Sequence, residues 1–358
     1  MKKKALYAGF ILLVLVIVIY IGIRSGDFPA SIHAILNMPA RFAVLSVCSM
    51  FCALSMEALS LGSALKAQGL HLPFRRLYAT CLLGAFYSYI TPGASGGQPM
   101  QVYQFHKWRL PIGQATASLT IHFHCFQGML LVFDVVLFAV YHRFVLDELG
   151  PNLPFLIVGF VFNIGLLAVS LMIAFYQRPV RWLLRKVANL MRRFKIGNPD
   201  ALENAMGGMA DGFYTGMKRL VANRAEVVRQ ILIASCRVVF LMSVMYFIYL
   251  GLGLREASYG KILTMGCMQY TSAAYTPLPG ASGAQEGVFG LYFAGMLPNA
   301  LLLSGLLAWR FVTYYLVLIV GFVVTTAMGM RHTSVEEAEA EVANEVEQER
   351  ETSEKLQG

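Results

Sequence analysis

Long uninterrupted runs of apolar residues dominate the chain. Each run approaches or exceeds the roughly 20 residues that an α-helix needs to cross the hydrocarbon core of a bilayer. The first run follows three lysines, as a signal peptide would, but it is longer than the usual apolar core of about 7–15 residues. We therefore expect a retained first span and an all-α polytopic membrane protein. The six full transmembrane helices are predicted at residues 5–23, 42–64, 115–141, 154–176, 231–254 and 300–328.

Two further apolar stretches, 78–105 and 262–297, are interrupted by related motifs. The first motif reads TPGASGGQ (91–98), and the second, PGASGAQ (279–285), repeats its last seven residues with one change. Proline disfavours helix at the preceding residue, and glycine permits backbone conformations that other residues resist. We therefore expect each stretch to form a re-entrant hairpin of two short helices.

The distribution of Lys and Arg predicts the orientation. Cytoplasmic loops of membrane proteins carry an excess of these residues. The segment 178–230 carries 11 Lys/Arg and four acidic residues. If 78–105 crossed the membrane completely, this basic segment would face outwards. A re-entrant hairpin keeps the segment and both termini in the cytoplasm.

The same elements divide into two halves. A span, a hairpin and a span make up about 42–141, and the same series recurs in about 231–328. Because the two halves begin on opposite sides of the membrane, they predict an inverted-topology repeat, in which transporters place a site near the midplane. The membrane domain would cover 1–330. The Glu-rich tail, 331–358, is expected to be solvated helix or disordered chain in the cytoplasm.

Composition narrows the class of function. The chain is 57% hydrophobic and 14% charged, against roughly 25% charged in soluble domains. In a membrane protein the net charge of +9 points to topology and anionic lipid headgroups and not to nucleic acid. The six cysteines lack metal-ligand spacing, and no phosphate-binding G-x-x-x-x-G-K-[ST] occurs. We expect no metal, no cofactor and no enzymatic activity.

Each motif has the residues of an anion-binding helix terminus. Ser and Gln stand at capping-box spacing in both, which would open a new helix with free N–H groups at each hairpin tip. Pro99 fits such a helix better if the cap is Gly96 or Gly97. The alternative is that the glycines serve only tight packing. The candidate substrate-binding residues of the tips are Thr91, Gly93, Ser95, Gly96, Gln98, Gln101, Gly280, Ser282, Gly283, Gln285 and Glu286.

Charged residues predicted at membrane depth extend the candidate site. A charge at the centre of a membrane helix costs about 2.5–3.5 kcal/mol on insertion scales, so it usually faces a cavity or a partner. Arg310 is the strongest candidate, because a guanidinium binds two phosphate oxygens at once. Glu286 is its expected partner, and a purely structural pair is the alternative. Asp134 is expected near the outer interface, in contact with water. Weaker candidates are Glu57, Arg237, His122 and His124.

Three segments together carry a resemblance to a known family. YITPGASGGQPMQVYQF, PLPGASGAQEGVF and WRFVTYYL resemble the lysylphosphatidylglycerol synthase transmembrane-region family over about residues 5–330. This is the flippase-like half of the bacterial multiple peptide resistance factor. In that factor a cytoplasmic domain aminoacylates phosphatidylglycerol and the membrane region moves the product across the bilayer. The matching positions are 91–98, 101, 279–286 and 310. The chain ends in the acidic tail, so we expect no synthase activity from it.

These observations predict a lipid translocator of the bacterial cytoplasmic membrane. Its substrate would be a polar, anionic or aminoacylated phospholipid or a lipid-linked headgroup, held between the two hairpin tips. Two alternatives stay open: an anion channel or ion-coupled solute transporter, and a non-transporting partner of a lipid-synthesis enzyme. Membrane lipids are the expected partners. A lipid-synthesis enzyme and a second copy of the chain are further partners that the sequence leaves open, whereas nucleic acid is not expected.

Overall fold

The computed structural model describes residues 27–178, 199–273 and 283–329, together with positions 182, 186, 189, 192 and 281. Within these residues every secondary-structure element is a helix, which confirms the all-α prediction. The predicted span 5–23 and the tail 331–358 lie outside the described residues. So do positions 274–280 and 282, which include Gly280 and Ser282 of the second motif.

Four helical runs in the described part are long and apolar enough to cross a membrane. They cover the predicted spans from 42–64 onwards, which supports a membrane protein. The runs are α3 (Ala40–Ala67), the stretch Ile112–Phe175, α10 (Arg224–Gly251) and the stretch Asn299–Ala327. The second run contains α6 (Ile112–Leu149), the 3₁₀ turn η2 (Gly150–Asn152) and α7 (Leu153–Phe175). The fourth contains α13 (Asn299–Arg310), the π-helical turn η4 (Phe311–Tyr315) and α14 (Leu316–Ala327).

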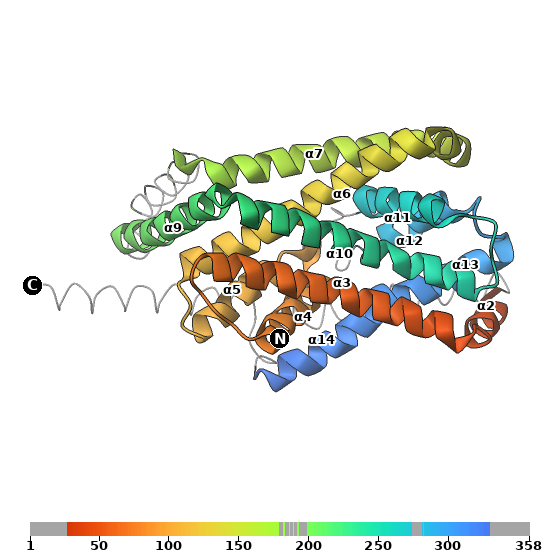
Figure 1. Cartoon of the computed structure of the whole chain (residues 1–358), viewed down its shortest axis with the longest axis horizontal. Coiled ribbons are helices and arrows are strands. Elements are labelled where there is room, and N and C mark those ends of the chain that lie inside the picture. The colour runs from red at the N-terminus through yellow and green to blue at the C-terminus, as the bar shows by residue number, and fades with distance from the viewer. Residues whose placement is uncertain are drawn as a thin grey trace, which may run out of the picture.

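The helices α3 and α10 lie side by side at the centre of the bundle (Figure 1). Buried residues of α3 recur every three or four positions, and many of them are small. Small side chains let two helix backbones approach closely, which is how helices associate where lipid removes the hydrophobic driving force. The buried small residues of α3 are Ser46, Ser49, Ala53, Ala58, Ser60 and Ala64.

Each motif separates two helices that are shorter than the roughly 20 residues of a typical membrane crossing. The helices α4 (Phe74–Ile90) and α5 (Gly97–Lys107) have 17 and 11 residues, and the 3₁₀ turn η1 (Pro92–Ala94) lies between them. In the second half, α11 (Tyr259–Ala273) has 15 residues and α12 (Ala284–Phe293) has 10. The sequence therefore located both breaks correctly.

The two breaks share one unusual backbone conformation. Ala94 has a φ of 55° and Ala281, its equivalent in the second motif, has a φ of 49°. A residue with a Cβ atom is disfavoured in this left-handed region by roughly 1–2 kcal/mol. Gly93 also has a positive φ, of 58°, where glycine carries no such penalty. The two tips differ after the alanine, because Gly283 has a φ of 88° whereas its equivalent in the first motif, Gly96, has a φ of −81°. The shared sequence thus encodes one shared, locally strained residue and not an identical turn.

The two helix pairs occupy opposite halves of the bundle. In Figure 1, α4 and α5 (orange) lie towards one end of the long axis, and α11 and α12 (cyan) lie towards the other. The long helices α3, α6 and α10 run between these ends. Two further helices, α2 (Asp27–Leu36) and α9 (Pro199–Ala222), pack at the ends, against α13 and α6 respectively.

Glycine makes the close packing of the first hairpin possible. Gly97 opens α5 and faces the backbone of α4, so that a Cβ atom added there would lie 2.7 Å from the carbonyl oxygen of Gly84. Backbone atoms cannot rotate out of the way as a side chain can. The packing alternative considered for the motif glycines therefore describes Gly97 well.

We expect Gly97→Ala to destabilise the protein by about 1–3 kcal/mol, the usual cost of forcing extra atoms into a packed interior. Gly128→Ala is the matched control, because Gly128 is also helical but an added Cβ there meets no atom within 4 Å. Its better helix propensity should leave stability unchanged or slightly higher. Thermal unfolding in detergent measures both, and equal midpoints for the two variants would contradict the packing argument.

Candidate functional site

Arg310 and Glu286 form an ion pair in the second half of the bundle. The guanidinium Nε of Arg310 donates to Oε1 of Glu286 at 2.6 Å. Their side chains are only 7% and 14% exposed. Arg310 is the last residue of α13, directly before the π-helical turn η4, and such turns occur often at functional sites. The predicted pairing is confirmed.

Glu286 also holds the start of α12. Its Oε2 accepts the backbone N–H of Gly283 at 2.6 Å. Gly283 is the N-cap of α12 and Glu286 is its third helical residue, the acceptor position of a capping box. The predicted box placed Gln285 in this role. That assignment was wrong, because the side chain of Gln285 instead accepts from Nε2 of Gln269 at 3.0 Å and joins α12 to α11.

Thr91 has the corresponding function at the first tip. Its hydroxyl accepts the N–H of Gly96 at 2.9 Å and donates to the carbonyl of Tyr87 at 2.6 Å. The N-cap of α5 is Gly96, with no side-chain capping bond, so the predicted Ser95–Gln98 capping box is absent. The N–H of Ser95, which the Gln98 side chain would accept in such a box, donates instead to the carbonyl of Pro92 at 3.2 Å. Starting α5 at Gly97 also puts Pro99 in the first helical turn, where its missing N–H is tolerated.

The remaining predicted residues of the first tip differ in exposure. Gly93, Ser95 and Gln98 are exposed, whereas Gly96 is buried. Gln101, three residues after Gln98, is buried. Gln101 is 6% exposed, and its Nε2 donates to the carbonyl of Thr80 at 3.2 Å. The side chain therefore packs inside the first hairpin.

Two tyrosines connect the first hairpin to Arg310. The rings of Tyr89 and Tyr314 have centroids 4.8 Å apart, and the hydroxyl of Tyr89 donates to the carbonyl of Thr313 at 3.0 Å. The guanidinium carbon of Arg310 lies 4.9 Å from the ring centroid of Tyr314. Contacts therefore run from Tyr89, two residues before Thr91, through Tyr314 and Arg310 to Glu286 and the second tip.

The sequence contained a signal for these tyrosines that sequence reasoning missed. Tyr314 follows Arg310 by four residues, the spacing at which side chains meet on one helix face. Tyr89 stands in the last turn of the helix that leads into the first motif. An arginine at membrane depth favours aromatic neighbours, because a ring face attracts the cation.

The weaker candidates lie in a separate polar cluster between α3, α6 and α10. Arg237 donates to Oε2 of Glu57 at 2.5 Å and to Nε2 of His122 at 3.3 Å. The Nδ1 atom of His122 lies 2.8 Å from the hydroxyl of Ser60, which itself donates to Gln230. His122 is therefore assigned as neutral, with Nδ1 as donor and Nε2 as acceptor.

This cluster continues towards the start of α10. Gln230 donates to Glu226 at 2.8 Å, and Glu226 accepts the hydroxyl of Ser63 at 2.8 Å. His124 is not part of it: its Nε2 lies 3.0 Å from the hydroxyl of Ser170 on α7. The structure thus joins Glu57, Arg237 and His122 to one another and not to the capping contacts of the tips.

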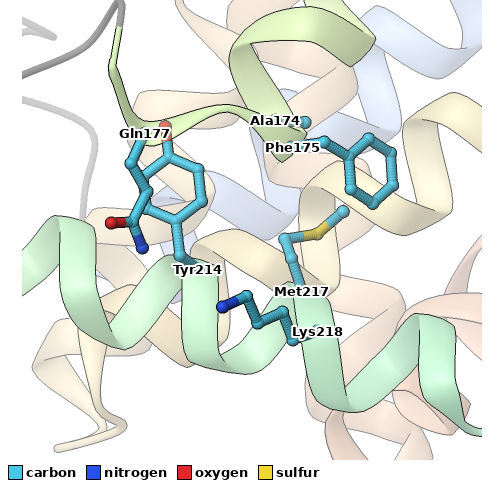
Figure 2. Close-up of a pocket in the computed structure, with 6 residues that line it drawn as sticks. All are labelled: Ala174, Phe175, Gln177, Tyr214, Met217 and Lys218. Carbon is cyan, nitrogen blue, oxygen red and sulfur yellow. The ribbon is translucent and has the colours of Figure 1, made fainter.

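A small cavity lies elsewhere, between the end of α7 and α9 (Figure 2). Its volume is ≈ 110 Å³, and none of the described motif residues lines it. The hydroxyl of Tyr214 donates to the carbonyls of Ile173 and Tyr176, at 2.9 and 3.1 Å, which fixes α9 to the end of α7. The lining residues are Ala174, Phe175, Gln177, Tyr214, Met217 and Lys218.

The described part of the chain contains no candidate metal-binding site. There, no three or more His, Cys, Asp or Glu side chains are grouped so that they could hold a metal ion.

Comparison with known proteins places the chain in a family. The family model of the lysylphosphatidylglycerol synthase TM region matches residues 6–321, nearly the whole chain, including both motifs and Arg310. No individually curated protein matches the chain. This match confirms the resemblance carried by the three sequence segments. It also supports the interpretation of the chain as a membrane protein related to lipid handling. The chain belongs to the lysylphosphatidylglycerol synthase transmembrane-region family.

Proposed function

We propose that this protein translocates a polar or anionic lipid across the bacterial cytoplasmic membrane, with the headgroup passing between the two hairpin tips. The observation that carries the proposal is the Arg310–Glu286 pair. Glu286 caps the helix that follows the second motif. Arg310 contacts the ring of Tyr314, which packs against Tyr89 just before the first motif. A buried charge in such a place is expected to serve a function as well as stability.

An internal two-fold repeat is supported by the pattern of helix contacts. Exchanging the two halves turns the pair α3–α4 into α10–α11, and α4–α5 into α11–α12, and all four pairs are in contact. The same exchange turns α4–α14 into α11–α6, which also pack together. In addition, α3 contacts its own equivalent, α10. A pseudo-two-fold relation accounts for all of these pairs.

The short helices support re-entrant hairpins. Since α4 with α5 and α11 with α12 lie towards opposite ends of the bundle, one hairpin would enter from each side of the membrane. The irregular backbone at each tip is tolerated in a membrane only where protein or water surrounds it. A pathway for a headgroup between the tips satisfies this condition.

The ion pair suggests how a headgroup is bound. A lipid phosphate would compete with the Glu286 carboxylate for the guanidinium of Arg310, because both are anionic partners of matching geometry. Displacing Glu286 would also weaken its bond to the N–H of Gly283 and so loosen the second tip. The exposed Ser95 and Gln98 offer polar contacts at the first tip. The acyl chains would stay in the bilayer while one repeat rocks against the other.

Arg310→Ala should reduce lipid flipping more than tenfold, because a charged hydrogen bond worth about 1.5–3 kcal/mol is lost at the headgroup. Glu286→Ala should also slow flipping, since it removes the cap of α12. The assay uses vesicles that contain the purified protein, fluorescent phosphatidylglycerol and a membrane-impermeant quencher. Arg143→Ala, at an exposed position on α6, is the control and should behave as the unmodified protein.

Unchanged flipping in both Arg310→Ala and Glu286→Ala, with folding intact, would refute the site assignment. Ion flux through the same vesicles without lipid movement would instead favour the anion-channel alternative.

A second experiment separates the Glu57–Arg237 pair from the lipid path. Arg237→Met alone should destabilise the fold by about 3–5 kcal/mol, because it leaves Glu57 as an uncompensated buried charge. The double variant Glu57→Leu/Arg237→Met should recover most of that stability and should still flip lipid. Thermal unfolding and the flipping assay measure the two effects. A double variant that folds but does not flip would show that this pair contacts the substrate.

A further inference from the structure

Asp134 is a buried carboxyl group for which the proposed function has no role so far. It lies on α6 and is 2% exposed, so the expectation that it contacts water near the outer interface was wrong. The reason is tertiary: α11 packs against α6 and covers this position. A carboxyl group inside a membrane protein is costly unless a partner compensates it.

The hydrogen bonding of Asp134 is one-sided. Oδ2 accepts the hydroxyl of Thr271 at 2.5 Å, whereas Oδ1 is buried and has no hydrogen-bond partner in the described structure. No Lys, Arg or His of the described residues pairs with it. The titratable groups that face it from neighbouring helices are the thiol of Cys267 on α11 and the phenol of Tyr292 on α12. Neither supplies a positive charge.

The polar side chains next to Asp134 are already engaged with each other. Gln127 of α6 donates to Oδ1 of Asn163 on α7, and Nδ2 of Asn163 donates to the carbonyl of Thr271 at 2.8 Å. Asn163 is fully buried. Hard metal cations need several oxygen ligands. Because the neighbouring amide side chains are already hydrogen-bonded, the Asp134 carboxylate is the main group here that could bind a cation. A proton needs only that one group.

Thr271 connects Asp134 to the second hairpin. It stands in the last turn of α11, directly before the segment that leads into the second motif. The next residue, Ser272, shares a hydrogen bond of 2.6 Å with the hydroxyl of Tyr292 on α12. Gln269 bonds to Gln285 across the same pair of helices. A change at Thr271 therefore acts on the arm that carries the second tip.

We propose that Asp134 is a proton-binding site that couples protonation to the position of the second hairpin. The inference rests on the proposed lipid translocation and assigns it a proton as the coupling ion. As a carboxylate, Asp134 accepts from Thr271. Once protonated on Oδ2, Asp134 donates its O–H to Thr271, and the Thr271 hydroxyl becomes the acceptor and turns its own proton away from Asp134, because a hydroxyl can fill either role. This reversal changes the hydrogen bond that joins the end of α11 to α6.

Asp134→Asn tests the proton site, because the amide has the same shape, can still accept from Thr271 and does not titrate. Asp147→Asn, on the same helix but exposed, is the matched control. Infrared spectroscopy of the purified protein should show a carboxyl band that titrates with pH and vanishes in Asp134→Asn only. If the band is identical in the unmodified protein and Asp134→Asn, Asp134 does not bind a proton and the proposal fails, whether or not lipid is flipped.

The coupling to the hairpin needs two further readouts. Flipping by the unmodified protein should change several-fold between acidic and alkaline buffer, and this dependence should disappear in Asp134→Asn. Hydrogen exchange of the peptides spanning 262–297 should show the same loss of pH dependence. The exchange measurement tests the coupling even if the unmodified protein moves no lipid, an outcome that would refute the proposed function alone.

Two results would overturn the coupling. One is an unaltered pH dependence of hydrogen exchange in Asp134→Asn, and the other is a flipping rate that follows Na⁺ at constant pH. If Asp134→Asn does not fold, Thr271→Val replaces it. Loss of the hydroxyl donor removes support for the carboxylate, so the titration of the carboxyl band should move to higher pH. A band that titrates as before would contradict the arrangement.

Discussion

A broken helix inside a membrane protein must find partners for the backbone groups that the helix no longer satisfies. Most of this fold follows from how the chain meets that constraint at two places. At the first tip the hydroxyl of Thr91 accepts the N–H of Gly96. At the second tip the carboxylate of Glu286 accepts the N–H of Gly283. Nearly identical sequences thus use different side chains for the same task.

The choice of partner gives the second tip a property that the first lacks. Thr91 is neutral, so its cap is complete within the first hairpin. Glu286 is charged and buried, so it needs a cation, and Arg310 provides one at 2.6 Å. The cap of α12 therefore depends on a residue from another helix, and through Tyr314 on contact with Tyr89 of the first hairpin. A ligand that competes for Arg310 would act on both tips.

Other buried polar groups of the bundle also need partners, and they differ in how completely they are paired. In the Glu57–Arg237–His122 cluster every charge has an opposite charge or a hydrogen-bond donor beside it, which favours one rigid arrangement. Asp134 has a hydroxyl donor on one oxygen and none on the other in the described structure. A group compensated this incompletely is suited to change its charge, whereas a fully paired one is suited to hold helices together.

The sequence by itself determined the helical class, the positions of the spans that the structure describes and the location of both breaks. Each of these follows from local chemistry: apolar runs of sufficient length, and Gly and Pro where a helix must stop. The Arg310–Glu286 pair was also predictable, because two opposite charges in an apolar half of the chain have few other partners. The capping residues were not, since Ser95, Gln98 and Gln285 fit the capping pattern as well as the residues that carry it out.

Only the tertiary structure decided which side chains are buried and which of them contact each other. Gln101 turns into its own hairpin because Gly84 leaves room for it, and Gln98, three residues earlier, stays exposed. Asp134 is buried because α11 covers α6, a contact between residues more than one hundred positions apart. Tyr89 meets Tyr314 across an even longer separation. Local sequence fixes where helices begin and end, but burial and pairing depend on which helix packs against which face.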